Sequence, residues 1–325
     1  RIGVVIDHQP PRHYRRHRPA RLTMVLALAS VLAVLLAACG GRSQSPGPAG
    51  TGAPTAPAKC TQKVSDSAAL NQALSSASAG DTICVAGDLG KSRVNITKGG
   101  SDGQPISVIG NKTPAGGISV EADNVVVDGF VLDQPQAPGA ELRGNNITLR
   151  NTWINDPQDG DNDGIRFFGN GIKILHNTVA KTAPRNKSHA DCMQTFATDS
   201  DHPASQDVLI DGNRCEQIDN NCLIAEGPNS SADDGSGEGE SKNITFSNNY
   251  CENHAAQAVL LDDVTGAVIT GNQIAGRTNH AFALQNNSTG AVIKDNKITG
   301  RVKYEVGMDE DSEQNYQGPP VGGEP

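Results

Sequence analysis

An eleven-residue pattern occurs seven times between positions 124 and 300, and it constrains the fold more than any other feature of the chain. Its second position is aliphatic or Ala, and its fourth is large and apolar. Alternating apolar positions, a corner and a second short apolar stretch predict two strands joined by a tight turn. Because one copy cannot bury its own apolar face, we expect the copies to stack as a solenoid of strands.

The seventh position of the pattern predicts how the corners are held. It is Asn in the last five copies: Asn177, Asn213, Asn249, Asn272 and Asn296. Asn tolerates a left-handed backbone, and its amide can bond to the same amide one repeat away. We therefore expect a column of Asn side chains along one corner of the solenoid.

A third short strand precedes each copy, for example Ile165–Phe168 and Leu223–Glu226. The copies start 22, 25, 36, 36, 23 and 24 residues apart. Coils of this length with an Asn corner resemble the pectin-lyase-like superfamily, over roughly residues 79–300. The resemblance implies an all-β, right-handed parallel β-helix with three-strand coils and about seven to eight rungs. Apolar residues at helical spacing in residues 65–76 predict a short N-terminal capping helix.

Residues 1–38 have the pattern of an export signal. Five Arg between positions 12 and 21 precede an apolar run over residues 24–35 that is too short to span a membrane comfortably. Residues 36–39 look like a bacterial lipobox, in which Cys39 carries the lipid. We expect an exported protein, lipid-anchored to the cell membrane and facing outside. A plain signal peptide of a secreted protein is the alternative.

The rest of the chain divides by composition. Residues 39–59 are rich in Gly, Pro, Ala, Ser and Thr and predict a flexible tether. Residues 60–300 form the predicted β-helix domain, and the acidic, Gly- and Pro-containing residues 301–325 predict a disordered tail.

Charge narrows the class of partner. Six Arg and one Asp stand in residues 1–38, so the remainder carries 21 basic and 35 acidic side chains, a net charge of −14. Nucleic acid is therefore excluded as an expected partner, and membrane contact is expected only through the lipid anchor. An acidic body meets an anionic polymer through a local basic cluster or a bound cation. No pattern indicates an oligomeric state.

Six cysteines remain besides Cys39, and an even number in an exported protein predicts disulfides. Two pairs occupy equivalent places in successive copies, and adjacent rungs lie about 4.8 Å apart, a Cα separation that a disulfide accepts. Buried free thiols stacked in a ladder are the alternative for these two internal pairs. The predicted disulfides are Cys192–Cys222, Cys215–Cys251 and, by exclusion, Cys60–Cys84.

The two 36-residue intervals locate the expected site. Their extra residues, at 182–190, 197–206 and 227–242, flank the same strand of successive coils. Insertions in solenoids gather on one face and commonly build the binding site there. The middle coils, with their entry corners, carry a candidate catalytic set of Arg166, His189, Asp191, Gln194 and Glu226, and candidate substrate-binding residues Asp161, Asp163, Phe168 and Phe196.

These residue types suit chemistry on a uronate. His189 beside Asp191 could abstract a proton, and Arg166 could neutralise a substrate carboxylate. Glu226 and Asp262 should be stacked neighbours that share a proton or bind calcium, the one cofactor that the sequence suggests. Phe168 and Phe196 should form an outward platform for a sugar, and the alternative is that an inserted loop covers them. The rival interpretations are that Asp163 and Asn221 only satisfy turn amides and that His189 is an exposed loop residue.

We therefore expect an exported surface protein that acts on an acidic polysaccharide by lyase-type β-elimination. The alternatives are a non-catalytic protein that binds glycan or envelope polymer, a glycoside hydrolase using Glu226 and Asp262, and a uronate epimerase. Neither the Gly-His-Gly and Arg-Ile-Lys blocks of polygalacturonase-like sequences nor the Asp-Pro-His-Asp signature of mannuronan epimerases occurs. The assignment therefore depends on position in the fold rather than on a motif.

Overall fold

The computed structural model describes residues 59–183 and 189–325. The predicted export signal, Cys39 and residues 40–58 of the tether lie outside the described residues. Within the described part of the chain, no helix has both the length and the apolar character needed to cross a membrane.

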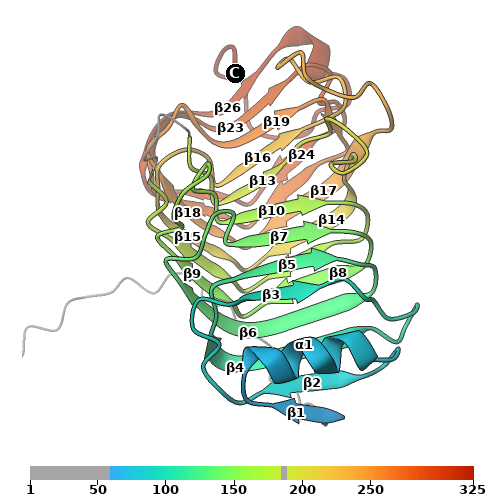
Figure 1. Ribbon diagram of the computed structural model, residues 1–325. Coiled ribbons are helices and arrows are strands. Elements are labelled where there is room, and N and C mark those ends of the chain that lie inside the picture. Colours follow the sequence, from blue (N-terminus) through green and yellow to red (C-terminus); the bar gives the residue numbers. More distant parts are fainter. Residues whose placement is uncertain (1–58, 184–188) are drawn as a thin grey trace, which may run out of the picture. The chain divides into compact units, whose positions relative to one another are not determined.

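The strands that open successive coils form one parallel sheet. In sequence order these strands are β3 (Arg93–Ile96), β5 (Gly117–Glu121), β7 (Ala140–Arg143), β10 (Ile165–Phe168), β13 (Met193–Thr195), β16 (Leu223–Glu226), β19 (Gln257–Asp262), β23 (Arg277–Gln285) and β26 (Arg301–Met308). Each pairs with the equivalent strand of the next coil, and Figure 1 shows them stacked in chain order. The predicted parallel β-helix is confirmed.

The eleven-residue copies supply the other strands of each coil. Their first halves lie in β6 (Val125–Asp133), β8 (Ile147–Arg150), β11 (Lys173–Leu175), β14 (Gln206–Asp211), β17 (Ser241–Ser247), β21 (Val268–Thr270) and β24 (Val292–Lys294). Their second halves lie in β9 (Trp153–Asn155), β12 (Thr178–Ala180), β15 (Arg214–Ile218), β18 (Tyr250–Asn253), β22 (Gln273–Ile274) and β25 (Lys297–Ile298). The long strand β6 pairs with both β8 and β9 and so joins the two sets. The remaining strands are β1 (Gln62–Val64), β2 (Thr82–Val85), β4 (Ile106–Pro114) and β20 (Val264–Thr265).

The apolar positions of the repeat form the core. Every side chain at the second and fourth positions is at most 1% exposed, from Val125 and Val127 to Ala291 and Ile293. Full burial of one Val, Leu, Ile or Phe side chain contributes about 1.5–3 kcal/mol. Since each copy stacks its apolar positions on those of its neighbours, the repeat pattern itself specifies the register.

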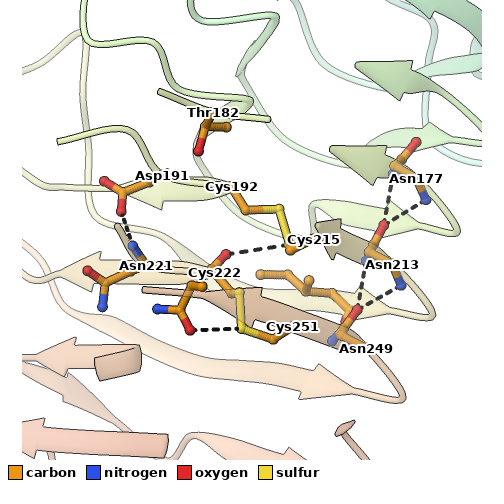
Figure 2. The surroundings of a disulfide bond; sticks show 12 residues. Asn177, Thr182, Asp191, Cys192, Asn213, Cys215, Asn221, Cys222, Asn249 and Cys251 are labelled. Carbon is orange, nitrogen blue, oxygen red and sulfur yellow. Dashed lines mark hydrogen bonds between the residues drawn. A yellow bond between two sulfur atoms is a disulfide. The ribbon is translucent and has the colours of Figure 1, made fainter. Parts of the chain in front are cut away.

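The predicted Asn column exists. The side-chain amide of Asn177 donates to Oδ1 of Asn213 at 3.1 Å, and Asn213 donates in the same way to Asn249 at 3.0 Å. The column continues through Asn272 to Asn296, and Figure 2 shows its first three members. The left-handed residue is not the Asn itself but the residue before it, such as His176 with φ 54°. At this corner the Asn therefore supplies the side-chain hydrogen bonds between coils, and the residue before it adopts the left-handed backbone conformation.

The predicted capping helix is confirmed as α1 (Ser67–Ser76). Its N-cap is Asp66, whose side chain accepts from the backbone N–H of Ala69 at 2.9 Å. The buried face of α1 carries Leu70, Ala73 and Leu74, which belong to the same hydrophobic core as the strands. The helix thus covers the end of the stack, where an open coil would expose apolar side chains (Figure 1).

The prediction of a disordered tail at residues 301–325 is wrong. Residues 301–308 form β26, which pairs with β23 and buries Val306 and Met308. A 3₁₀ helix, η1 (Glu310–Ser312), follows, and Val321 then forms an isolated bridge with Val306. The acidic composition was misleading because most of the tail's charges point outward while its few apolar residues close the last coil.

Two of the three predicted disulfides are also wrong. Cys60–Cys84 is confirmed, but the internal pairs are Cys192–Cys215 and Cys222–Cys251, not Cys192–Cys222 and Cys215–Cys251 (Figure 2). Cys215 and Cys251 are register partners, as expected. Stacked side chains point in the same direction, whereas a disulfide needs its Cβ atoms about 3.8 Å apart and facing each other. Each bridge instead crosses the interior of one coil, with Cα separations of 5.9 and 6.0 Å.

Candidate active site

The strands that open the coils align the outward side chains as expected. Arg166 on β10 pairs in register with Gln194 on β13, and Gln194 pairs with Ile224 on β16. Two residues further along β16, Glu226 pairs with Asp262 on β19. The register therefore places Arg166, Gln194 and Glu226 on one face of three successive coils.

Arg166 is held by two carboxylates. Its Nε donates to Asp163 at 2.8 Å, and its Nη2 bonds to both Asp161 and Asp163. Burial lowers the pKa of this guanidinium, but Asp163 and Asp161 outweigh burial and the net shift is upward. Arg166 is thus a permanent cation whose charge is largely balanced by its own neighbours. Its Nη1 makes no hydrogen bond to any described residue.

Behind Arg166, buried carboxylates and amides connect the coils. Oδ1 of Asp163 accepts the backbone N–H of Asp191 at 2.8 Å. Oδ1 of Asp191 accepts the backbone N–H of Asn221 at 2.7 Å and the side-chain amide of Asn220 at 2.9 Å. Figure 2 shows the contact between Asp191 and Asn221. Both carboxyl groups are at most 1% exposed and act as the link between successive corners, which agrees with their role in satisfying turn amides.

His189 is the exposed member of this group. Its Nδ1 lies 3.4 Å from Oδ2 of Asp191, and its side chain is 63% exposed. The interaction with Asp191 raises the pKa of the imidazole to about 9, against the opposing effect of burial, with further help from Asp163 and Asp161. At neutral pH His189 is therefore a cation that is open to solvent.

Glu226 is half-buried, and its pKa is raised to about 7. Burial is the main cause, followed by the negative charges of Asp262, Asp234 and Asp191. The charge of His189 acts in the opposite direction, so the fields of His189 and Asp191 both reach Glu226. Glu226 and His189 therefore interact electrostatically, without a hydrogen bond or ion pair between them in the described part of the chain.

Gln194 pairs in register with Ile224, which stands two residues before Glu226 on the neighbouring strand. It is 7% exposed, and its Oε1 has no hydrogen-bond partner among the described residues. A buried polar atom without a partner is costly, by about 1–3 kcal/mol, which is consistent with a ligand group completing the site.

Asp262 was expected to share a proton or a calcium ion with Glu226, but its hydrogen bonds go to other residues. Its carboxylate accepts hydrogen bonds from the backbone and hydroxyl of Ser231, from Gln285 at 2.8 Å and from Asn286 at 2.9 Å. It therefore anchors the loop of residues 227–240 to the following coil. No group of three or more His, Cys, Asp or Glu side chains within residues 59–183 and 189–325 is arranged to hold a metal ion. The calcium site of Glu226 and Asp262 stays a prediction.

The two Phe side chains do not form the predicted exposed platform, because Phe168 is buried. Phe168 is fully buried, because Phe196 packs edge-on against it at 4.9 Å and His202 at 4.7 Å. His202 comes from the insertion at residues 197–206, which covers this part of the face. Only Phe196 is partly exposed, and the guanidinium of Arg166 lies 5.6 Å from its ring centre. The prediction that Phe168 faces a sugar is wrong, and the alternative of a covering loop holds for this residue.

Sequence reasoning missed Asn220 and gave no role to Asp219. Burial and the charge of Asp191 raise the pKa of Asp219, whereas His189 and His254 lower it. The doublet Asn220–Asn221 at a coil corner, directly after an acidic residue, was the available signal.

Comparison with known proteins identifies the fold. No protein-family model and no curated protein matches the chain. Among solved structures it is similar to a mannuronic acid specific polysaccharide family 6 lyase from human gut microbiota, at 16% identity and a TM-score of 0.55, over 76% of this chain and 66% of that one. It is also similar to a mutant of the PL6 family alginate lyase AlyGC, at 15% identity and a TM-score of 0.53, over 75% of this chain and 40% of that one. The chain thus spans less than two thirds of either relative, and the likeness shows a right-handed parallel β-helix.

Proposed function

We propose that this protein cleaves an acidic polysaccharide by β-elimination at the face that carries Arg166, His189, Gln194 and Glu226. One observation carries the proposal. On this face the environment raises the pKa of Glu226 to about 7 and that of His189 to about 9. Between these values one group is a carboxylate and the other an imidazolium, so a base and an acid coexist in the same cluster.

Each group has a role in the elimination. The carboxylate of Glu226 takes the proton from the carbon next to the uronate carboxyl group, and the electron pair forms a carbon–carbon double bond. The glycosidic oxygen leaves from the adjacent carbon with the bonding electrons and takes a proton from His189. An imidazole that stays protonated to about pH 9 donates rather than accepts at neutral pH. His189 is therefore proposed as the acid, not as the base expected from sequence.

Two other residues would position the substrate. Nη1 of Arg166 has no acceptor among the described residues and can donate to the uronate carboxylate. Neutralising that carboxylate makes the neighbouring proton easier to remove. If its side chain turns outward, the now buried Oε1 of Gln194 can accept from a sugar hydroxyl and so gain the partner it lacks among the described residues.

The alternative of a glycoside hydrolase needs a second available carboxylate beside Glu226. Asp262 is 2% exposed and its oxygens already accept several hydrogen bonds, which weighs against that role. Two solved structures of the same fold are polysaccharide lyases, one of them mannuronic acid specific, and this supports uronate polymers as first substrates.

The test is a panel of uronate polymers, each assayed with and without calcium. Elimination produces an unsaturated uronate with ultraviolet absorbance, whereas hydrolysis produces new reducing ends without it. We expect the absorbance to appear with wild type and to fall at least 100-fold in rate in Glu226→Gln and His189→Ala. Glu313→Gln is the matched control, because Glu313 is exposed and lies in the tail. Reducing ends without absorbance, or binding without turnover, would contradict the proposal.

We also propose that Cys39 anchors the protein to the outer side of the cell membrane. The basis is the lipobox-like sequence of residues 36–39. The variant Cys39→Ala should move the protein from the membrane fraction to the soluble fraction. Retention of the variant in the membrane fraction would contradict lipid anchoring.

A further inference from the structure

A basic groove lies outside the candidate active site, on the last coils. It is a cavity of about 580 Å³ whose lining includes His254, Arg277, Asn279, Arg301 and Lys303. His254 precedes β19, Arg277 and Asn279 lie at the start of β23, and Arg301 and Lys303 at the start of β26. Four of these five side chains are basic, in a chain with a formal net charge of −9.

Two arginines of the basic groove, Arg277 and Arg301, have no ion-pair partner among the described residues. Arg277 and Arg301 are register partners on adjacent strands, about 4.8 Å apart, and both are exposed. Neither forms an ion pair or a hydrogen bond with any side chain of residues 59–183 or 189–325. Lys303 lies on the same strand as Arg301, with its ammonium 4.9 Å from the ring centre of Tyr304. Stacked like charges repel, so an anion from outside the protein would relieve the arrangement.

We propose that the basic groove binds carboxylates of the same acidic polysaccharide, several sugars away from the bond that is cleaved. This inference rests on the proposed function. The planar guanidinium groups of Arg277 and Arg301 match the two oxygens of a carboxylate. Two such groups in adjacent coils suit a polymer that carries a carboxylate on each sugar.

The position of the groove along the stack supports one continuous substrate path. Strands β13, β16, β19, β23 and β26 are consecutive in the sheet. The groove residues and His189 all lie at or just before the start of these strands, on the same edge, so Arg277 and Arg301 are roughly 14–19 Å from His189 along the stack. Between them Asp219 feels the charges of both His189 and His254. A chain that runs along the stack would therefore contact the cluster at one end and the groove at the other.

The experiment compares uronate oligomers of two lengths by isothermal titration calorimetry. Binding is measured in a Glu226→Gln background, so that the ligand is not consumed. The test variant adds Arg277→Gln and Arg301→Gln; the matched control adds Lys294→Gln and Lys297→Gln, two exposed cations on the other sheet with the same change of net charge. We expect the double Arg variant to weaken binding of a long oligomer about tenfold or more, with little effect on a disaccharide.

Several outcomes would contradict the proposal that the basic groove binds the polysaccharide. An unchanged Kd for the long oligomer, an equal loss for both lengths, or the same loss in the Lys control each excludes it. Tighter binding of an oligonucleotide or of a sulfated polymer without uronate would overturn the carboxylate assignment. If only the proposed function is wrong, the result differs: the basic groove still binds the long oligomer, but wild type forms no unsaturated product.

Discussion

The backbone N–H of Asp191 donates to Oδ1 of Asp163 at 2.8 Å, which brings two buried carboxyl groups from successive coils to one corner. Burial, and then the charge of Asp191, raise the pKa of Asp163 from 3.8 to about 6, although Arg166 acts against the shift. The corner is therefore more stable when Asp163 carries a proton, and folding and protonation are linked.

The first prediction concerns stability between pH 4 and pH 7. A carboxyl group whose pKa is raised on folding stabilises the protein fully below its unfolded pKa, and this contribution is lost as the pH rises through the folded pKa. The shift of Asp163 of about two units corresponds to about 3 kcal/mol. We expect the free energy of unfolding of wild type, relative to Asp163→Asn, to fall by most of that amount from pH 4 to pH 7, because at pH 4 the unfolded carboxyl group is already partly ionised. Urea unfolding at a series of pH values measures this difference. An exposed control, Asp102→Asn, should show a constant difference, and a constant difference for Asp163→Asn would refute the linkage.

The second prediction concerns the Asn column. In the middle of the column, Oδ1 of Asn213 accepts from the backbone and side chain of Asn177, and its amide donates to Ile174 and Asn249. Asn213→Ala would leave several of these buried groups without partners, so we expect a loss of about 2–4 kcal/mol. Asn296→Ala, at the half-buried end of the column, should cost clearly less. Chemical denaturation compares the two, and equal losses would mean that the column does not act through burial.

The third prediction distinguishes the observed disulfides, which lie within one coil, from disulfides between adjacent coils. In Cys192→Ser, the bridge across the coil leaves Cys215 as the free thiol. Labelling with a maleimide in denaturant, followed by peptide mass spectrometry, should therefore modify Cys215. A label on Cys222 would indicate the pairing between adjacent rungs.

Sequence reasoning worked best where a feature repeats. The apolar positions around Val125 and Val127, the order of the strands and the column from Asn177 follow from one pattern seen seven times, because stacking forces equivalent residues into register. The outward line from Arg166 through Gln194 to Ile224 followed from the same register.

Sequence reasoning failed where side-chain direction or a loop decides the outcome. Cys215 and Cys251 are in register, yet register does not say that Cys215 faces Cys192 across the coil. Phe168 is in the predicted column, but His202 from an insertion covers it. Asp262 is also in its column, but it anchors a loop through Ser231. Loops carry no repeat, so their paths could not be derived from the pattern.

The basic groove had a sequence signal that was not used. Arg277 and Arg301 occupy equivalent positions in successive coils, but both lie outside the overlong coils on which the site prediction concentrated. A search for repeated charge, alongside repeated apolar positions, would have found the pair.

The most direct test of the account is the pH dependence of kcat/KM for unsaturated-product formation from a uronate polymer. The proposed base and acid predict a bell-shaped profile, with a rising limb near pH 7 from Glu226 and a falling limb near pH 9 from His189. In His189→Ala the residual activity should lose the falling limb. The absence of unsaturated product from every uronate polymer across this range, or a wild-type profile without either limb, would contradict the proposed chemistry.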